Sequence, residues 1–314
     1  MLDWLISLWS DPNTRWILLG CMLLGLGSGV IGSFTFLRRE SLLGDTLAHA
    51  ALPGVCIAFM LNEVKSASLF LLGALFAGIA AVLCVSAITR WTKIKSDASM
   101  GIVLTFFFGV GTVMLTHIQH SGSGSQSGLD KYLFGQAAAM VTSDVYILMG
   151  VSVLLIVAAI LLFKEFKLIS FDPGFARGIG LPVGILEHTM LILTTVAVAA
   201  GIQAVGVVLV AALLITPAAA ARYWTDRLPV MLAFAGLFGA LSGASGAAIS
   251  TLGEGIPTGP VTVLVATLLF VLSLLFAPGR GWFSKILRHR NLKSTYAQSA
   301  ERSALNAAEG GTPK

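Results

Sequence analysis

An aspartate and a histidine, Asp45 and His49, stand four residues apart within an apolar stretch of the chain. On a helix this spacing places both side chains on one face, about one turn apart. An ionisable side chain inside a bilayer costs roughly 2.5 kcal/mol or more, so an intramembrane pair of this kind usually serves a function. A carboxylate and a neutral imidazole suit Mn²⁺, Fe²⁺ or Zn²⁺. The pair therefore predicts a metal site; the other interpretation is an ion pair or hydrogen bond that links two helices.

Two ligands are too few to hold a metal tightly, which suits a site that must release its ion. A second copy of the chain across a twofold axis would raise the number of protein ligands to four. Cys56 lies on nearly the same helical stripe, where a thiolate would favour zinc, but Pro53 intervenes and packing is the preferred interpretation. His117 and His120, at the outer end of a later apolar run, are candidates for passing metal inward, although ordinary interfacial residues are the simpler account. Glu187 and His188 are expected to lie at the solvated end of a span. Glu254 lies in an outer turn, where contact with an extracytoplasmic partner is one interpretation and an ordinary polar loop residue the simpler one. His289 belongs to the basic tail and is expected to face lipid headgroups or water.

The composition indicates a protein that crosses the membrane many times. Of the 314 residues, 56% are hydrophobic and 11% charged, and the mean hydropathy is +0.88, whereas soluble domains contain roughly 25% charged residues. Because a span needs about 20 apolar residues, little chain is left for a soluble domain. We expect an all-α polytopic membrane protein with about nine transmembrane helices, in a range of about eight to ten, near residues 16–37, 44–61, 69–90, 100–117, 145–163, 186–204, 206–222, 229–250 and 261–277.

The distribution of basic residues predicts the orientation. One set of alternate loops and the C-terminal tail hold 17 of the 20 lysines and arginines, and the other set holds 3. The positive-inside rule then places the N-terminus outside and the C-terminus in the cytoplasm. Residues 1–279 are expected to form one transmembrane domain, and residues 280–314 a basic, disordered cytoplasmic tail.

Small and helix-breaking residues predict how the helices pack. Pro53 and Gly54 predict a kink in the second span, which would expose backbone carbonyls near the candidate site. Two pairs of glycines are spaced four residues apart, Gly25 with Gly29 and Gly239 with Gly243. This spacing predicts close approach of helix backbones. The three cysteines are expected to be small core residues: Cys21, Cys56 and Cys84.

The longest cytoplasmic insertion, residues 164–184, predicts a short amphipathic helix at the membrane surface. Asp172 is suited to cap its N-terminus, with Pro173 in the first helical position. Gly178 or Gly180 is suited to end it in a left-handed conformation. Since a loop that only returned the chain would be much shorter, we expect this helix to dock a partner.

The sequence contains no signature of its own energy source or of catalysis. There is no G-x-x-x-x-G-K-[ST] and not even one Gly-Lys pair, so no Walker A loop binds ATP here. No H-E-x-x-H occurs, nor a G-x-S-x-G in a plausible setting. The chain is therefore not expected to be an enzyme, and a transporter built from it would need an ion gradient or a separate ATPase.

Four segments, in order along the chain, resemble the metal-ion permeases of bacterial ABC importers, the manganese, zinc and iron class. The first contains Arg38-Arg39-Glu and Gly44-Asp45-Thr-Leu-Ala-His49, and it ends in Leu-Pro53-Gly54. The others are Tyr132-Leu-Phe-Gly135, Ser170-Phe-Asp172-Pro173-Gly-Phe-Ala176-Arg177, and the stretch from Val205-Gly206 to Thr216-Pro217-Ala218-Ala. The resemblance covers most of the chain and implies an ABC importer permease fold in the bacterial inner or plasma membrane.

The resemblance also implies partners and residue roles. The chain would be half of a dimeric permease, made of two identical or two related copies. It would receive metal from an extracytoplasmic binding lipoprotein and be driven by a dimer of cytoplasmic ABC ATPases. Asp45 and His49 would then coordinate the transported Mn²⁺, Zn²⁺ or Fe²⁺, with no permanently bound cofactor, and membrane lipid but no nucleic acid would be a further partner. The ATPase coupling region would comprise Phe171, Asp172, Pro173, Phe175, Ala176, Arg177 and Gly178.

Three other functions compete with a divalent-metal ABC permease. A gradient-driven secondary transporter commonly shows matching broken helices in both halves, but the chain has no second D-x-x-x-H. An ABC permease for cobalamin or an iron-siderophore would need a wide path rather than two close ligands. An intramembrane metalloprotease would need a catalytic zinc signature. Among metals, an oxygen and nitrogen site without a nearby thiolate favours manganese, with zinc or iron as alternatives, whereas ligand types alone do not fix the ion.

Overall fold

The structure is a computed structural model, which describes residues 12–62, 67–120, 142–251, 256–278, 281, 282 and 284. Every regular element in these ranges is a helix. They are α2 (Pro12–Leu37), α3 (Leu43–Asn62), α4 (Ala67–Trp91), α5 (Ser96–His120), α7 (Thr142–Leu161), α8 (Phe163–Phe171), α9 (Pro173–Gly178), α10 (Val183–Val205), α11 (Val207–Trp224), α12 (Leu228–Ser250) and α13 (Thr258–Phe276).

The long helices confirm the predicted all-α membrane protein. Within the described ranges, eight helices are long and apolar enough to cross a membrane. A ninth apolar segment, Val210–Trp224 of α11, is shorter. These nine correspond to the nine spans predicted from the sequence, and the shorter one is the span expected near 206–222. Two small helices, α8 and α9, fill the insertion between α7 and α10, where the sequence predicted only one.

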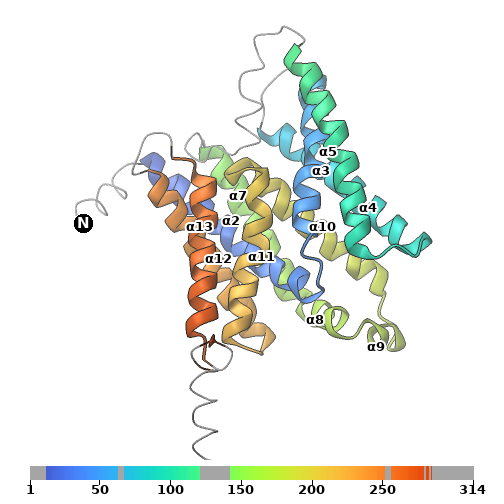
Figure 1. Cartoon of the computed structure of the whole chain (residues 1–314), viewed down its shortest axis with the longest axis vertical. Coiled ribbons are helices and arrows are strands. Elements are labelled where there is room, and N and C mark those ends of the chain that lie inside the picture. The colour runs from blue at the N-terminus through green and yellow to red at the C-terminus, as the bar shows by residue number, and fades with distance from the viewer. Residues whose placement is uncertain are drawn as a thin grey trace, which may run out of the picture.

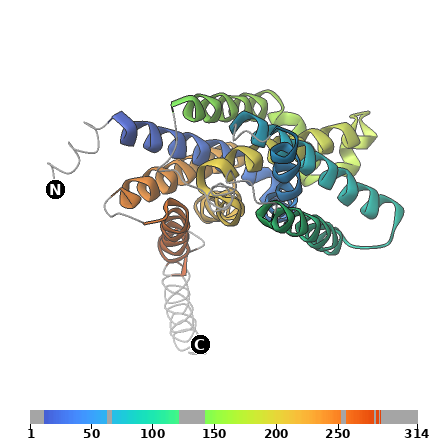
Figure 2. The same cartoon turned by 90° about the horizontal axis from the view of Figure 1, so that it is seen from above.

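Two groups of helices make up the bundle (Figures 1 and 2). The first is built on α2, which packs along α12 and α7 and also contacts α11 and α10. The second consists of α3 with α4 and α5. The long helices α10 and α11 touch both groups. Helix α3, which carries the candidate metal pair, is therefore held on several sides.

Glycines bring α2 and α12 into backbone contact, as their spacing predicted. A methyl group added to Gly25 would overlap the carbonyl of Gly239, and one added to Gly29 would overlap the carbonyl of Ala235. Gly243 packs in the same way against the carbonyl of Cys21. These positions exclude any side chain, because backbone atoms on the facing helix cannot move aside as a flexible side chain would.

One end of the bundle, here called the α9 end, gathers most of the described basic residues. It comprises α8, α9 and the chain segments 38–42, 92–95, 179–182 and 225–227 (Figure 1). The basic residues located there or in the adjoining helix ends are Arg38, Arg39, Arg90, Lys93, Lys95, Lys164, Lys167, Arg177, Arg222 and Arg227. The direction in which this end faces stays a prediction of the positive-inside rule.

A helix cap at the α9 end places the start of α3. The backbone N–H of Arg39 donates to the carbonyl of Phe36, and that of Glu40 donates to the carbonyl of Thr35. This is the Schellman pattern that closes a helix C-terminus, and it puts Arg39 in the left-handed region at φ 61°. The chain then turns at once, since the N–H of Leu43, the first residue of α3, donates to the carbonyl of Glu40.

Pro53 lies inside α3 without ending it. The helix runs from Leu43 to Asn62, so the second span is continuous rather than broken. A proline has no N–H to donate to the carbonyl four residues earlier, which here belongs to His49. Next to it, Gly54 packs against the backbone of Gly73 on α4. The kink expected at Pro53 stays a prediction, whereas the carbonyl of His49 has lost its ordinary helical partner.

Candidate metal site and coupling region

The first two turns of α3 place Asp45 and His49 side by side. Asp45 lies in the first turn, and its Oδ1 is 3.5 Å from Nε2 of His49. The side chain of Asp45 is 43% exposed and that of His49 is 25% exposed. The pair thus opens onto one face of the chain instead of being sealed between its helices.

The imidazole of His49 is held by an aromatic contact and keeps one nitrogen unsatisfied. Its ring meets the ring of Phe108 on α5 edge-on, with centroids 4.9 Å apart and planes at 80°. Nδ1 of His49 is buried and has no hydrogen-bond partner among the described residues. A buried polar atom without a partner costs about 1–3 kcal/mol. The hydrogen-bonding capacity of this nitrogen is therefore not met by any described residue.

The described residues contain no larger cluster of metal-binding side chains. Among them no group of three or more histidine, cysteine, aspartate or glutamate side chains lies together. The two-ligand contribution of one copy stays a prediction.

The other metal candidates lie apart from this pair or are buried in apolar surroundings. Cys56 is buried against α5, with its Sγ 3.9 Å from the carbonyl of Gly111, as expected of a packing residue. His120 Nδ1 lies 2.8 Å from the carbonyl of Thr116 near the end of α5. Cys21 is buried, but Cys84 is exposed on α4, so its assignment to the core was wrong. Glu254, His289 and the Tyr132–Gly135 motif lie outside the described residues.

The insertion forms the capped surface helix that its sequence predicts. Phe175 donates its backbone N–H to Oδ1 of Asp172 at 2.8 Å, and Pro173 occupies the first turn of α9. Gly180, at φ 87°, reverses the chain after the helix. The predicted cap, first residue and left-handed glycine are all confirmed.

Helix α9 has one buried anchor, and exposed aromatic side chains lie on it and at the end of α8 just before it. Ala176 is wholly buried in an apolar cluster that includes Phe34 of α2 and Phe166 of α8. Phe171 and Phe175 are each 56% exposed. Exposed aromatic side chains of this kind are typical anchors of protein interfaces. Ala176 therefore holds the helix on the bundle, and the two phenylalanines face outward.

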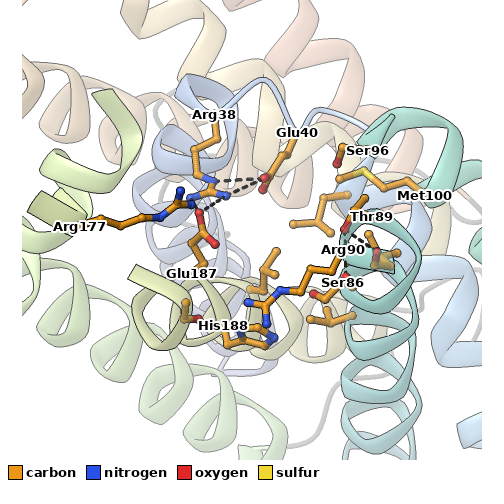
Figure 3. Close-up of a pocket in the computed structure, with 15 residues that line it drawn as sticks. Arg38, Glu40, Ser86, Thr89, Arg90, Ser96, Met100, Arg177, Glu187 and His188 are labelled. Carbon is orange, nitrogen blue, oxygen red and sulfur yellow. Dashed lines mark hydrogen bonds and ion pairs between the residues drawn. The ribbon is translucent and has the colours of Figure 1, made fainter. Parts of the chain in front are cut away.

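A polar cavity of about 390 Å³ lies at the α9 end (Figure 3). Its lining includes Arg38 and Glu40 from the α2–α3 segment, Arg90 from α4, Arg177 from α9 and Glu187 from α10. Arg38 hydrogen-bonds to both Glu40 and Glu187, and Figure 3 shows the three side chains together. Burial raises the pKa of Glu40 above its ordinary value, although the adjacent Arg38 lowers it.

Sequence reasoning missed the role of Glu187. We expected this residue to be solvated, but it is only 25% exposed and pairs with Arg38. The available signal was a carboxylate on the first turns of a span at the end where basic residues gather. The neighbouring His188 makes a local contact within α10, where its Nδ1 lies 2.6 Å from the carbonyl of Gly184.

Comparison with known proteins identifies the family. Residues 10–277 match the model of the ABC 3 transport family. The chain is 51% identical over 290 residues to the manganese transport system membrane protein MntC of Bacillus subtilis, covering 91% of this chain and 67% of that protein. It is 42% identical over 288 residues to the zinc transport system membrane protein TroC of Treponema pallidum, covering 92% and 97%.

A solved structure supports the same assignment. PsaBC from Streptococcus pneumoniae, in complex with Fab, superposes with a TM-score of 0.79 at 29% identity and covers 92% of this chain and 99% of the matched chain. Helix α3, which carries Asp45 and His49, and helix α9 both lie within the region that matches the family. The chain therefore belongs to the ABC 3 transport family and is a membrane permease of an ABC importer.

Proposed function

We propose that this permease carries divalent metal ions, with Mn²⁺ as the preferred cargo, into the bacterial cytoplasm. The observation that carries the proposal is the half-open pair of Asp45 and His49. A carboxylate oxygen beside an imidazole nitrogen suits Mn²⁺, Fe²⁺ and Zn²⁺. The two relatives named for manganese and zinc transport support the same cargo class.

The preference for manganese rests on the donor atoms near the pair. Cys56, on the same helix, is buried against α5, so a soft thiolate ligand is not offered to the ion. Harder oxygen and nitrogen ligands suit Mn²⁺, and the carbonyl of His49, freed by Pro53, is a further oxygen donor. Zn²⁺ and Fe²⁺ are the alternatives that a transport assay distinguishes.

We further propose that two permease copies share one ion across a twofold axis. The second copy is either identical or a related chain, and it covers the face onto which Asp45 opens. Without such cover a carboxylate 43% exposed would face lipid at a cost of several kcal/mol. Two copies bring two carboxylates and two imidazoles, and water completes the coordination shell.

The energy for transport comes, in this proposal, from a separate pair of cytoplasmic ABC ATPases. They dock on α9 and the residues around it, Phe171, Asp172, Pro173, Phe175, Ala176, Arg177 and Gly178. A metal-binding lipoprotein delivers the ion at the opposite end. The α9 end then faces the cytoplasm, in agreement with the gathering of basic residues there.

Uptake into vesicles reconstituted with the permease and its ATPase subunits, offered one metal at a time, tests the proposal. We expect ATP-dependent uptake of Mn²⁺ ahead of Zn²⁺ and Fe²⁺. Asp45→Asn should reduce uptake to background, whereas Asp226→Asn, which neutralises a carboxylate in the segment after α11, should leave it unchanged. Uptake without the ATPase, driven by a proton gradient, would contradict an ABC mechanism, and undiminished uptake by the inserted Asp45→Asn protein would exclude the metal site.

A further inference from the structure

Arg38 ties together two parts of the chain that are far apart in sequence. Its Nη2 lies 3.0 Å from Oε1 of Glu40, and its Nη1 lies 3.3 Å from Oε1 of Glu187 (Figure 3). The Arg38 and Glu40 side chains are only 15% and 14% exposed. Partly buried pairs of this kind interact more strongly than exposed ones, because water screens them less.

On one side the link reaches α9. Glu187 lies near the start of α10, and only residues 179–182 separate α10 from α9. This connection is stiff, since Leu181 donates its N–H to the carbonyl of Ala176 at 3.0 Å and Val183 donates to the carbonyl of Leu181 at 2.8 Å. A displacement of α9 therefore has to move the first turns of α10 and the carboxylate of Glu187.

On the other side the link reaches the candidate metal pair. Glu40 closes the C-terminal cap of α2, and its carbonyl accepts the N–H of Leu43 at the start of α3. Asp45 follows two residues later in the first turn of α3. A shift of the segment around Arg38 and Glu40 is thus transmitted directly to Asp45.

We propose that Arg38 is a positioning residue that couples movement of α9 to Asp45 through Glu187 and Glu40. The inference rests on the proposed function, in which α9 receives the ATPase and Asp45 holds metal. The Arg38 guanidinium is suited to this task because its planar fork engages both carboxylates at once. The attachment of α9 itself depends on the apolar cluster around Ala176 and Phe34, so that neutralising Arg38 removes the link without removing this attachment.

The first test measures coupling in the assembled complex. Arg38→Gln and Glu187→Gln are reconstituted with the ATPase subunits, and Mn²⁺ uptake and ATP hydrolysis are measured together. We expect the number of ions carried per ATP to fall about tenfold while hydrolysis continues, the size expected when a charge-assisted hydrogen bond is lost. Arg38→Lys should restore part of the ratio of ions to ATP, because lysine keeps the positive charge but lacks the planar guanidinium that donates to both carboxylates.

An ion pair of the same chemistry with a more exposed carboxylate serves as the control. Arg222 on α11 lies 3.4 Å from Asp226, just after that helix, and the two side chains are 28% and 69% exposed. Arg222→Gln should leave the ratio of ions to ATP unchanged. If Arg38→Gln and Glu187→Gln lowered uptake and hydrolysis in equal proportion, or lowered neither, the proposed coupling role would be wrong.

The second test does not depend on the cargo. With the exposed Cys84 replaced by serine, single cysteines are introduced at Leu42, just before α3, and at Ile179, just after α9, and carry spin labels. Distances between the two copies are measured with and without a non-hydrolysable ATP analogue. Both labels should move in the otherwise unaltered protein, and in Arg38→Gln only the label at Ile179 should still move.

These readouts separate the two proposals. Failure of the otherwise unaltered complex to carry Mn²⁺ would overturn the proposed cargo. The spin-label distances would still show whether Arg38 couples movement of α9 to the start of α3. Nucleotide-dependent movement at Leu42 that persists in Arg38→Gln would overturn the link whatever the cargo is. So would the absence of any movement at Leu42 in the protein that retains Arg38.

Discussion

The Arg38 guanidinium lies 3.3 Å from the carboxylate of Glu187, although the two residues are 149 positions apart in the chain. This contact joins the turn before α3 to the start of α10. It lies in the wall of the polar cavity at the α9 end (Figure 3). The segment that leads into α3 and the first turns of α10, the helix that follows α9, are thereby in direct electrostatic contact.

Glu40 should make stability depend on pH in a definite direction. Burial raises the pKa of Glu40 in the folded state. The charge of Arg38 and its hydrogen bond lower this pKa, but by less than burial raises it. As the pH rises above the ordinary pKa of 4.5, the unfolded carboxyl ionises before the folded one, and stability is lost until the folded pKa is passed. Replacement by Glu40→Gln removes this loss.

Thermal unfolding in detergent at a series of pH values checks this expectation. The melting temperature of Glu40→Gln relative to the unaltered protein should rise as the pH increases from 4.5, and then level off. A difference that shrinks with increasing pH would show that the Arg38 pair, and not burial, dominates Glu40.

Arg39→Gly should stabilise the cap of α2. A residue other than glycine at φ 61° carries a strain of about 1 kcal/mol, part of which is offset by the greater freedom of glycine in the unfolded chain. We expect a net gain of up to about 1 kcal/mol, seen as a higher melting temperature. A lower melting temperature would mean that the exposed Arg39 side chain makes a stabilising contact that outweighs its backbone strain.

Gly25→Ala and Gly239→Ala should destabilise the contact between α2 and α12. Each added methyl group would overlap the facing backbone, and overpacking of this kind costs about 1–3 kcal/mol. Gly150→Ala on α7 is the matched control, because nothing lies within 4 Å of its added methyl group. Melting temperatures in one detergent should fall for the first two variants and hold or rise for the third. Equal behaviour of all three would contradict the close α2–α12 packing.

Phe175→Ala should weaken ATPase docking without affecting the fold of the permease. Its side chain is 56% exposed, and Ile185 on α10 is 68% exposed, so Ile185→Ala removes a similarly exposed apolar group outside α9. Interface anchors of this type contribute about 2 kcal/mol or more to binding. We therefore expect recovery of the ATPase with the purified permease to fall at least about tenfold for Phe175→Ala. Similar losses in the two variants would argue against α9 as the docking site.

Sequence reasoning succeeded where local rules decide the structure. Helix lengths follow from apolar runs, the α9 cap follows from Asp172 and Pro173, and the close backbone approach at the glycines of α2 and α12 follows from their spacing, which did not say which helices would meet. The four-residue spacing of Asp45 and His49 was likewise sufficient to bring them together. Each of these features depends on residues close in the chain or on a repeated pattern.

Contacts between distant segments were not predictable in the same way. The partner of Glu187 depends on how α2 and α10 pack, which no spacing in the sequence reveals. Cys84 lies in an apolar run but on an exposed side of α4, because a helix that is apolar all round carries no pattern that marks its buried face. Similarly, α3 continues through Pro53, since neighbouring helices support it on both sides of that residue.

Pulsed electron paramagnetic resonance of Mn²⁺ bound to the assembled permease tests the central claim most directly. A site shared by two copies should hold one Mn²⁺ per two chains, with nitrogen coupling from imidazole that disappears in His49→Ala and with little bound Mn²⁺ in Asp45→Asn. His120→Ala should leave the signal unchanged. Nitrogen coupling that persists in His49→Ala, or full Mn²⁺ binding in Asp45→Asn, would show that the ion binds elsewhere and would contradict the account.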